Sequence, residues 1–422
     1  MRRILVLILI LSGLPALTAC YDALEVDDWA YVYTMGVDKG ISNKLRITVQ
    51  LPTMKSSGGG IDGGGQSSTG SGNKDFVVIS LDCPTFYTGV NMINSSLSRK
   101  INYSHSKYFV VSEDIAKEGM GNLMSAFVRD RQIRRTMHMI VVKGKARDFI
   151  KEINPVLGTA LSKTQEGMMN MEKVNGFFDD NDLGSFIDDI KSHKIQPVSV
   201  LAAINDFSNY KKEGQPTDEI KSAGDYYAGE LPRSDGNKTE YLGTAIFNGG
   251  KMVGEFNGDE TRALLMIKGE YETGSYVIHD PYNSKLLDTI IVNQQKKPDT
   301  KIDFKKEGKP DIEVKIFLEG EIQALQSTVN YESMEYKPIL ENKVETFLKE
   351  QIDKSISKAL ALNSDVFGFG EKASMKFLTI QDWEEYKWLE KFKDSSIKTE
   401  VQFVIRRTGT LIKTNPTKDG KQ

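Results

Sequence analysis

The sequence predicts a multidomain protein of mixed α/β and α+β class. We expect an N-terminal α/β domain with a mixed sheet, a small middle domain, and a C-terminal domain in which an antiparallel sheet carries a long helix. The chain has 422 residues, more than a single core usually organises, which indicates two or three domains. Segments with strand and helix periodicity alternate in the first half. In the second half, short β-rich segments precede one long amphipathic stretch.

The first twenty residues predict a signal peptide followed by a site of lipid attachment. Arg2 and Arg3 are followed by an unbroken apolar run over residues 4–11, which is typical of a secretory signal. The apolar stretch ends by Ala19 and is shorter than the roughly 20 residues that a spanning helix needs. Small residues directly before Cys20 resemble a bacterial lipobox, in which the thiol receives a diacylglycerol before cleavage. We therefore predict a signal peptide at residues 1–19 and lipid attachment at Cys20. The alternatives are an uncleaved signal anchor and ordinary secretion without a lipid, and both are less favoured.

The N-terminal α/β domain is expected over residues 20–204. Residues 31–37 and 45–51 are rich in β-formers and predict a loose hairpin. The glycine- and serine-rich residues 55–73 predict a flexible loop. After it, a strand, a helix and a second strand predict a crossover unit, which normally joins parallel neighbours. We expect strands at residues 76–81, 108–111 and 137–142. We expect one helix where an apolar stripe recurs (Phe86, Val90, Ile93 and Leu97), a second at residues 146–153, and further helical structure within residues 159–195.

A small middle domain is expected over residues 205–269. Its first part, residues 205–237, is polar and rich in glycine and proline, which indicates turns and a domain boundary. Residues 241–247 and 251–255 predict a hairpin, because the Asn248-Gly249 pair between them supplies the positive φ of a tight turn. A short helix is expected at residues 259–266.

The C-terminal α+β domain is expected over residues 270–413, with a frayed tail at 414–422. Short separations between its β-rich segments predict an antiparallel meander. Pro338 suits the first turn of a long helix, which an apolar stripe then continues. The expected strands are 274–279, 287–293, 301–305, 313–319 and 399–406, and the stripe is Leu340, Val344, Phe347, Leu348, Ile352, Ile356 and Leu360.

The sequence indicates no enzyme, cofactor or metal site. The four histidines lie in separate segments, without the paired spacing that zinc ligands show. The glycine-rich match at residues 58–63 has no following helix to bind a phosphate. Asp179, Asn181 and Gly184 imitate the start of a calcium loop, but the closing glutamate position holds Ile190. Apart from Cys20, the chain has only one cysteine, Cys83, which we expect to be a small buried residue without a disulfide partner.

The densest charge run lies at residues 129–135 and contains Arg129, Arg131, Arg134 and Arg135. We expect either a solvated helix end or a surface that contacts a partner or anionic lipid headgroups. The whole chain has 55 basic and 58 acidic side chains, a balance that does not favour binding to nucleic acid.

Several patches together resemble the Ger(x)C family, the lipoprotein C subunits of nutrient germinant receptors in endospore-forming bacteria. The resemblance covers nearly the whole mature chain and depends on the order and spacing of the patches. The residue after Cys20 is Tyr21 where the family usually has tryptophan, and residues 55–73 resemble an insertion. The patches are residues 20–28, 133–135, 242–247 with 252–254, and 365–370 with Trp383 and Trp388.

The resemblance implies a three-domain α/β protein on the outer face of the spore inner membrane, beside the integral-membrane A and B subunits of the receptor. It implies no catalytic residues and a role in receptor assembly or signal transmission that triggers germination. Residues 365–370 are either a glycine-shaped turn or a binding surface, and the two tryptophans are expected to be packed. The alternative is a solute-binding lipoprotein of a transporter, with a cell-wall enzyme as a weaker third.

Overall fold

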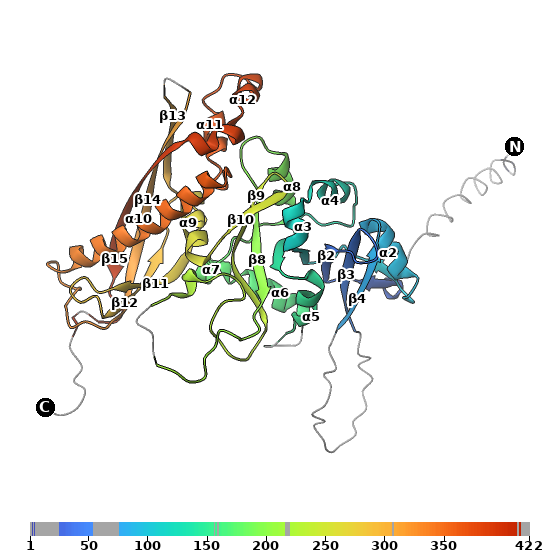
Figure 1. Cartoon of the computed structure of the whole chain (residues 1–422), viewed down its shortest axis with the longest axis horizontal. Coiled ribbons are helices and arrows are strands. Elements are labelled where there is room, and N and C mark those ends of the chain that lie inside the picture. Colours follow the sequence, from blue (N-terminus) through green and yellow to red (C-terminus); the bar gives the residue numbers. More distant parts are fainter. Residues whose placement is uncertain are drawn as a thin grey trace, which may run out of the picture.

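The computed structural model describes residues 2, 4, 25–53, 76–155, 157, 160–215, 220–305, 308–411, 413 and 414. Cys20, the loop predicted at residues 55–73 and the tail beyond residue 414 lie outside the described residues. The described part is an elongated α/β structure, with an eight-stranded sheet in one half and a five-stranded sheet with a long helix in the other (Figure 1). The predicted fold class is therefore confirmed.

The eight-stranded sheet is mixed and has a parallel centre. Its four central strands, β8, β7, β6 and β2, run parallel to one another, and antiparallel strands complete both edges. β6 is buried at every position, as expected for a strand covered on both faces. The strand order is β10 (Lys251–Phe256), β9 (Thr239–Asn248), β8 (Val198–Ile204), β7 (His138–Lys143), β6 (Tyr108–Ser112), β2 (Thr34–Lys39), β3 (Leu45–Pro52) and β4 (Phe76–Cys83).

Helices cover both faces of this sheet. One face packs against α2 (Phe86–Asn94), α3 (Glu113–Glu118), α4 (Gly121–Phe127) and α8 (Leu183–Lys191). The other packs against α5 (Ala146–Glu152) and α6 (Leu161–Met169), and α7 (Glu172–Asn175) follows. The predicted stripe of α2 is confirmed for Phe86, Val90 and Ile93, which are buried, but the helix ends at Asn94, so Leu97 does not belong to it. Cys83 is buried as expected, and burial raises the pKa of its thiol.

The predicted crossover between neighbouring strands is wrong in one respect. β4 and β6 run in the same direction, but β2 and β3 lie between them. The reason is that β2, β3 and β4 pair as consecutive antiparallel strands, which moves β4 to the edge. β6 then pairs with the other side of β2.

The eight-stranded sheet continues past the boundary expected at residue 204. The predicted hairpin is present as β9 and β10, and Gly249 at its turn has φ of +57°. β9 pairs with the free edge of β8, so the hairpin belongs to the first sheet. The described residues between β8 and β9 are mostly loop and include one short helix, η3 (Ala223–Asp225). The limits of the domains stay a prediction.

The five-stranded sheet is organised around one long strand, β14, and is not a sequential meander. β14 (Pro310–Leu325) is long enough to pair antiparallel with β12 (Leu287–Asn293) and β13 (Asp299–Phe304) at successive positions. β11 (Thr273–His279) pairs with β12, and β15 (Ser396–Arg407) pairs parallel with β14. The parallel pairing follows from the intervening helix, since a crossover returns the chain in the same direction.

The long helix α10 (Lys337–Ala361) begins and packs as predicted, with Leu340, Val344, Leu348 and Ile352 buried. Four short helices follow: α11 (Phe369–Ser374), α12 (Ile380–Tyr386), α13 (Trp388–Lys391) and η4 (Phe392–Asp394). Their core also contains Val198, Ile246 and Phe256 of the eight-stranded sheet. One hydrophobic cluster therefore includes residues of both halves.

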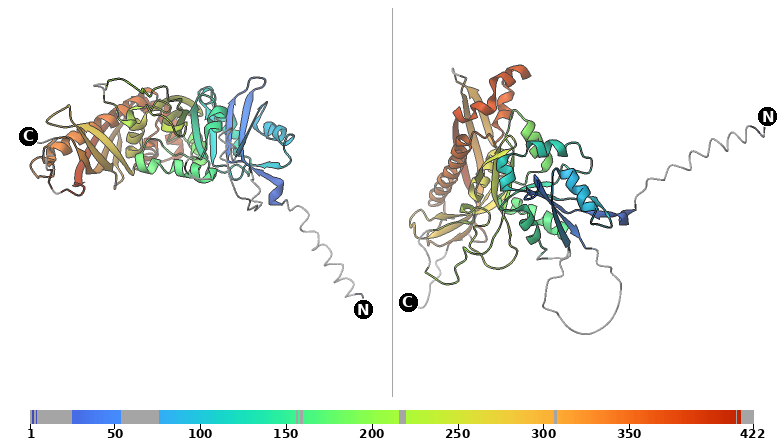
Figure 2. Two further views of the ribbon diagram at one scale, coloured as in Figure 1. Left: turned by 90° about the horizontal axis from the view of Figure 1, so that it is seen from below. Right: turned by 45° about the vertical axis from the view of Figure 1, so that its right-hand side comes forward.

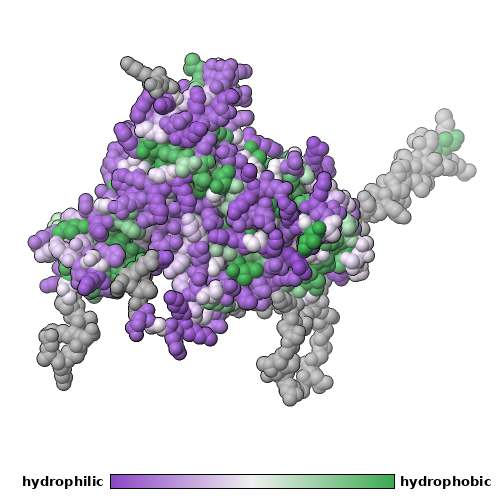
Figure 3. All heavy atoms as spheres, viewed as in Figure 1, coloured by the Kyte–Doolittle hydropathy of each residue, from purple (hydrophilic) through white to green (hydrophobic). Residues whose placement is uncertain are grey.

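The first continuous described segment, residues 25–53, begins at the end of the molecule that lies opposite the five-stranded sheet (Figure 2). There, η2 (Val26–Asp28) leads into β1 (Trp29–Tyr31), which pairs parallel with β5 (Lys100–Asn102). Hydrophilic residues dominate the face shown in Figure 3, and hydrophobic residues form separate smaller patches. Within the described residues, no helix combines the length and apolar composition that crossing a membrane requires.

Candidate functional site at the junction of the two sheets

Helix α9 (Gly258–Lys268) joins the two halves of the molecule. Asn257 accepts a hydrogen bond from Glu260 N, and the Glu260 carboxylate accepts one from Asn257 N, both at 2.9 Å. This capping box begins the helix, and Gly269 ends it with φ of +74°. Every residue from 258 to 267 is buried, so the helix is surrounded by protein on all sides. The predicted helix at residues 259–266 is confirmed.

Arg262 of α9 lies between the two halves and contacts both. Its Nε donates to Asn175 O at 2.7 Å, at the end of α7, and its NH1 donates to Ser275 O of β11 at 3.1 Å. The guanidinium also lies 4.1 Å from the Phe177 ring centroid and 4.4 Å from that of Tyr276. With only 2% of its side chain exposed, it pairs with Asp259 at 3.2 Å. This single cation satisfies polar groups of both halves in a dry environment.

Lys268, at the end of α9, makes a second connection between the halves. Its Nζ lies 2.8 Å from Asp179 Oδ2 and 2.6 Å from Glu270 Oε2. Asp179 is the first residue of the calcium-like pattern in the sequence, and in the structure its carboxylate pairs with this lysine. Burial, together with the nearby charges of Asp179 and Asp180, raises the pKa of Glu172 to about 8. No cluster of three metal-ligating side chains occurs within the described residues.

Residues 365–370, which we call the junction turn, form a buried turn against the N-terminal half. The Asp365 carboxylate accepts hydrogen bonds from Phe369 N at 3.1 Å and from Gly370 N and Trp388 Nε1, each at 2.8 Å. Gln196 N of the N-terminal half donates to Asp365 O at 2.9 Å. Burial raises the pKa of Asp365 to about 6, although these donors oppose the rise.

The junction turn requires glycine at two positions, for a different physical reason at each. Gly368 has φ of +74°, which favours glycine, and a Cβ on Gly370 would lie 2.1 Å from Lys194 O. Trp383 and Trp388 are 4% and 1% exposed and pack in the same core. Of the two interpretations of residues 365–370, the glycine-shaped turn is the one that the structure supports, and the tryptophans are packed as expected.

A pocket of about 300 Å³ opens beside the junction turn. Its charged lining side chains come from both halves, with Asp189 on α8, Lys268 and Glu270 near the end of α9, and Glu371 and Lys372 on α11. Burial raises the pKa of Asp189 to about 7, with Lys268 opposing the rise and Glu371 adding to it. The junction therefore holds carboxyl groups that exchange protons near neutral pH.

The four arginines predicted as a partner surface lie on the loop that follows α4. Arg129, Arg131 and Arg134 are exposed and form no ion pair with a described residue. Arg135 instead donates to Gly184 O at 2.9 Å and pairs with Asp188, both on α8. The structure thus keeps three of the four arginines available for contacts, and the fourth holds the loop against α8.

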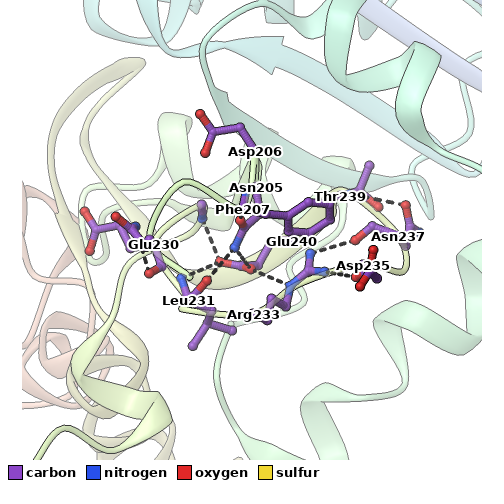
Figure 4. Close-up of polar contacts among 12 residues, drawn as sticks. Asn205, Asp206, Phe207, Glu230, Leu231, Arg233, Asp235, Asn237, Thr239 and Glu240 are labelled. Atoms are coloured by element: carbon purple, nitrogen blue, oxygen red, sulfur yellow. Dashed lines mark hydrogen bonds and ion pairs between the residues drawn. The ribbon is translucent and has the colours of Figure 1, made fainter. Parts of the chain in front are cut away.

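A further polar cluster organises the loop between β8 and β9, as Figure 4 shows. The buried Glu240 carboxylate accepts hydrogen bonds from Asn205 Nδ2 at 2.7 Å, Gly229 N at 2.8 Å and Arg233 Nε at 3.1 Å. The Arg233 guanidinium carbon lies 5.1 Å from the Phe207 ring centroid. Leu231 N also donates to this carboxylate at 3.4 Å. Because these four donors come from the segment between β8 and β9 and occupy the acceptor sites of Glu240 on β9, the cluster holds the loop and has no open position for a ligand.

Sequence reasoning missed Arg262, Lys268 and Glu240 as organising residues. A signal was present, because each is a charged side chain inside or next to a run of apolar residues. Such a position is costly unless the charge is paired. The partners that connect distant elements, Asn175 for Arg262 and Asp179 for Lys268, could not be named, because they lie 87 and 89 residues away along the chain.

Family models of spore germination proteins match most of the chain. The model of the spore germination protein N-terminal domain matches residues 22–204, and the model described as spore germination B3/GerAC-like, C-terminal, matches residues 242–409. The chain belongs to the Ger(x)C family of spore germination proteins. It has a role in spore germination, and the resemblance noted from the sequence is confirmed.

Similar proteins are matched over nearly their full lengths. Putative spore germination protein YfkR of Bacillus subtilis (strain 168) is 23% identical over 94% of this chain and 95% of its own length. Spore germination protein KC of the same strain is 22% identical over 99% of this chain and 98% of its own. The crystal structure of the GerBC protein has 17% sequence identity and a TM-score of 0.48, covering 88% of this chain and 96% of that one.

Proposed function

We propose that this Ger(x)C protein is the lipid-anchored C subunit of a nutrient germinant receptor. In this proposal, Cys20 carries a diacylglycerol that holds the protein on the outer face of the spore inner membrane. The protein contacts the integral-membrane A and B subunits and acts in assembly of the receptor or in transmission of its signal. The observation that carries the proposal is the match of two germination family models to most of the chain.

The lipid anchor is supported by the residues before Cys20, which resemble a lipobox. Two acyl chains give stable attachment where a single chain gives only marginal binding. The test is metabolic labelling with palmitate in a sporulating host. We expect label in the natural protein and none in Cys20→Ser, and label retained in Cys20→Ser would contradict the anchor.

A role in transmission is supported by the way α9 is packed. Arg262 and Lys268 of this helix bind groups of the N-terminal half, while Arg262 also binds β11 of the five-stranded sheet. A displacement of one half therefore acts directly on the other through a rigid, buried element. The exposed Arg129, Arg131 and Arg134 are the proposed contact surface for a partner subunit.

The decisive experiment deletes the gene and measures germination with single nutrients. We expect loss or slowing of the response to at least one nutrient, and complementation should restore it. Unchanged responses to all nutrients would remove the receptor proposal. The solute-binding alternative requires two similar lobes, whereas the sheets here have eight and five strands. It would be revived if calorimetry found tight binding of a nutrient to the purified protein.

A further inference from the structure

An apolar groove lies at the end of the molecule that contains η2 and β1. Its volume is about 390 Å³, and we call it the anchor face. It is formed by β1, the end of β3 with Thr53, the edge strand β4 and the segment between α2 and β5. Val77 on β4 is 47% exposed, so an apolar side chain faces solvent there. The lining residues include Trp29, Tyr31, Val77, Ile79, Leu97 and Arg99.

The anchor face lies close along the chain to the proposed lipid. Trp29 follows Cys20 by nine residues, a length of chain that spans at most about 30 Å when fully extended. η2 and β1 lie at the end of the molecule that is remote from the five-stranded sheet (Figure 2). A protein held by lipid at Cys20 therefore keeps this end next to the bilayer, while its other end is free to lie further away.

The composition of the anchor face suits the boundary between headgroups and acyl chains. Tryptophan and tyrosine have apolar rings with one polar group, and they favour this region of a membrane. Lys100 Nζ lies 5.3 Å from the centroid of the Trp29 ring, so a cation is available beside the aromatic side chain. Asp27 and Asp28 precede β1, so charges of both signs are present. The expected attraction comes from aromatic and apolar burial, and net charge contributes little.

We propose that the anchor face docks on the bilayer surface, with Trp29 and Tyr31 entering the headgroup boundary, and that this contact sets the orientation of the protein on the membrane. The inference rests on the proposed lipid attachment at Cys20. It adds a second membrane contact, which fixes an orientation that attachment at one residue alone does not fix.

Trp29 reports directly on this contact. The chain has three tryptophans, and the other two, Trp383 and Trp388, are 4% and 1% exposed. The chain from Cys20 onward, the proposed mature form, is coupled through the Cys20 thiol to maleimide-bearing lipid in phosphatidylcholine vesicles. Cys83 is buried, with a raised thiol pKa, and does not compete for the coupling. The assay thus tests docking whether or not the cell acylates Cys20.

We expect brominated acyl chains to quench the Trp29 emission, and we expect the quenching to persist at high salt. The matched variant Trp29→Phe should lose the vesicle-dependent quenching, and Val77→Asn should weaken it.

Equal emission in brominated and ordinary vesicles would overturn the inference. So would protection of Trp29 from acrylamide without vesicles, which would mean that another part of the chain covers the face. Protection that appears only when A and B subunits are added, without quenching by lipid, would assign the face to a protein partner and would also overturn it.

Mass spectrometry of the protein from spores separates this inference from the proposed function. Absence of diacylglycerol on Cys20 would contradict the lipid anchor, while the tethered-vesicle measurement would still decide whether the face binds a bilayer.

Discussion

The exposed arginine loop and the buried helix α9 use the same kind of side chain in opposite ways. Arg129, Arg131 and Arg134 lie in solvent and pair with no described acidic residue. Arg262 is 2% exposed and is bound by a carboxylate, two backbone carbonyls and two aromatic rings. A run of charged residues in a sequence thus indicates an exposed segment, because charged side chains remain in water unless they are paired. A solitary charge inside an apolar segment indicates a buried network that organises the fold.

The largest effect is expected at Arg262. Arg262→Met keeps an unbranched apolar stem but removes the guanidinium, which leaves Asp259, itself 2% exposed, without its cation. Removing one partner of a buried pair typically costs about 3–5 kcal/mol, and two backbone carbonyls lose donors as well. Urea unfolding should show this loss in the free energy of unfolding.

The matched control for Arg262 is Arg131→Met, which removes an exposed arginine. It should change the free energy of unfolding by no more than about 0.5 kcal/mol. Equal losses in the two variants would contradict the distinction between the two regions.

A smaller effect is expected at the junction turn. Asp365→Asn places an amide NH₂ group against backbone and indole N–H groups that now bind a carboxylate. A buried donor left without an acceptor costs about 1–3 kcal/mol. Urea unfolding measures the loss, and Asp303→Asn, at an exposed aspartate, is the control. Similar values for the two substitutions would show that the junction turn does not depend on the charge of Asp365.

The junction should also make stability depend on pH. The pKa values of Asp189 and Glu172 are raised to about 7 and about 8 in the folded protein, mainly by burial. The folded state therefore binds more protons than the unfolded state between about pH 4 and pH 8. In this window these two groups lower stability as pH rises, and below it their contribution no longer changes.

The test compares melting temperatures at a series of pH values. Asp189→Asn should flatten the decline between about pH 4 and pH 7, because the amide does not titrate. Asp188→Asn, at an exposed neighbour on the same helix, should keep the decline. An identical pH profile for Asp189→Asn and the natural protein would exclude Asp189 as a source of the effect.

The smallest effect on stability is expected in the arginine loop. Replacing Arg129, Arg131 and Arg134 together by glutamine should change the free energy of unfolding by no more than about 0.5 kcal/mol per site. If the loop contacts a partner subunit, spores that carry the triple variant should germinate more slowly while the protein remains folded. Glutamine at Lys285, Lys301 and Lys398, exposed lysines of the other half, is the charge-matched control. Normal germination of the triple variant would remove the loop from the contact surface.

The sequence by itself determined features that depend on neighbouring residues. The stripe of α10 predicted a long helix because its apolar positions recur with helical spacing. Asn248 and Gly249 predicted a hairpin because their backbone preferences select a tight turn. Cys20 was singled out by the segment directly before it, and its lipid attachment stays a prediction, because it lies outside the described residues.

Only the tertiary structure decided how these parts combine. The periodicity of a strand shows which side chains share a face but does not identify the neighbouring strand. The sequence therefore did not reveal that β9 and β10 complete the first sheet, or that β12 and β13 share one edge of β14. Likewise, Arg262 meets Asn175 and Ser275 only after the two halves have packed together. Such pairings depend on the packing and hydrogen bonding of residues distant in the chain, which no local pattern encodes.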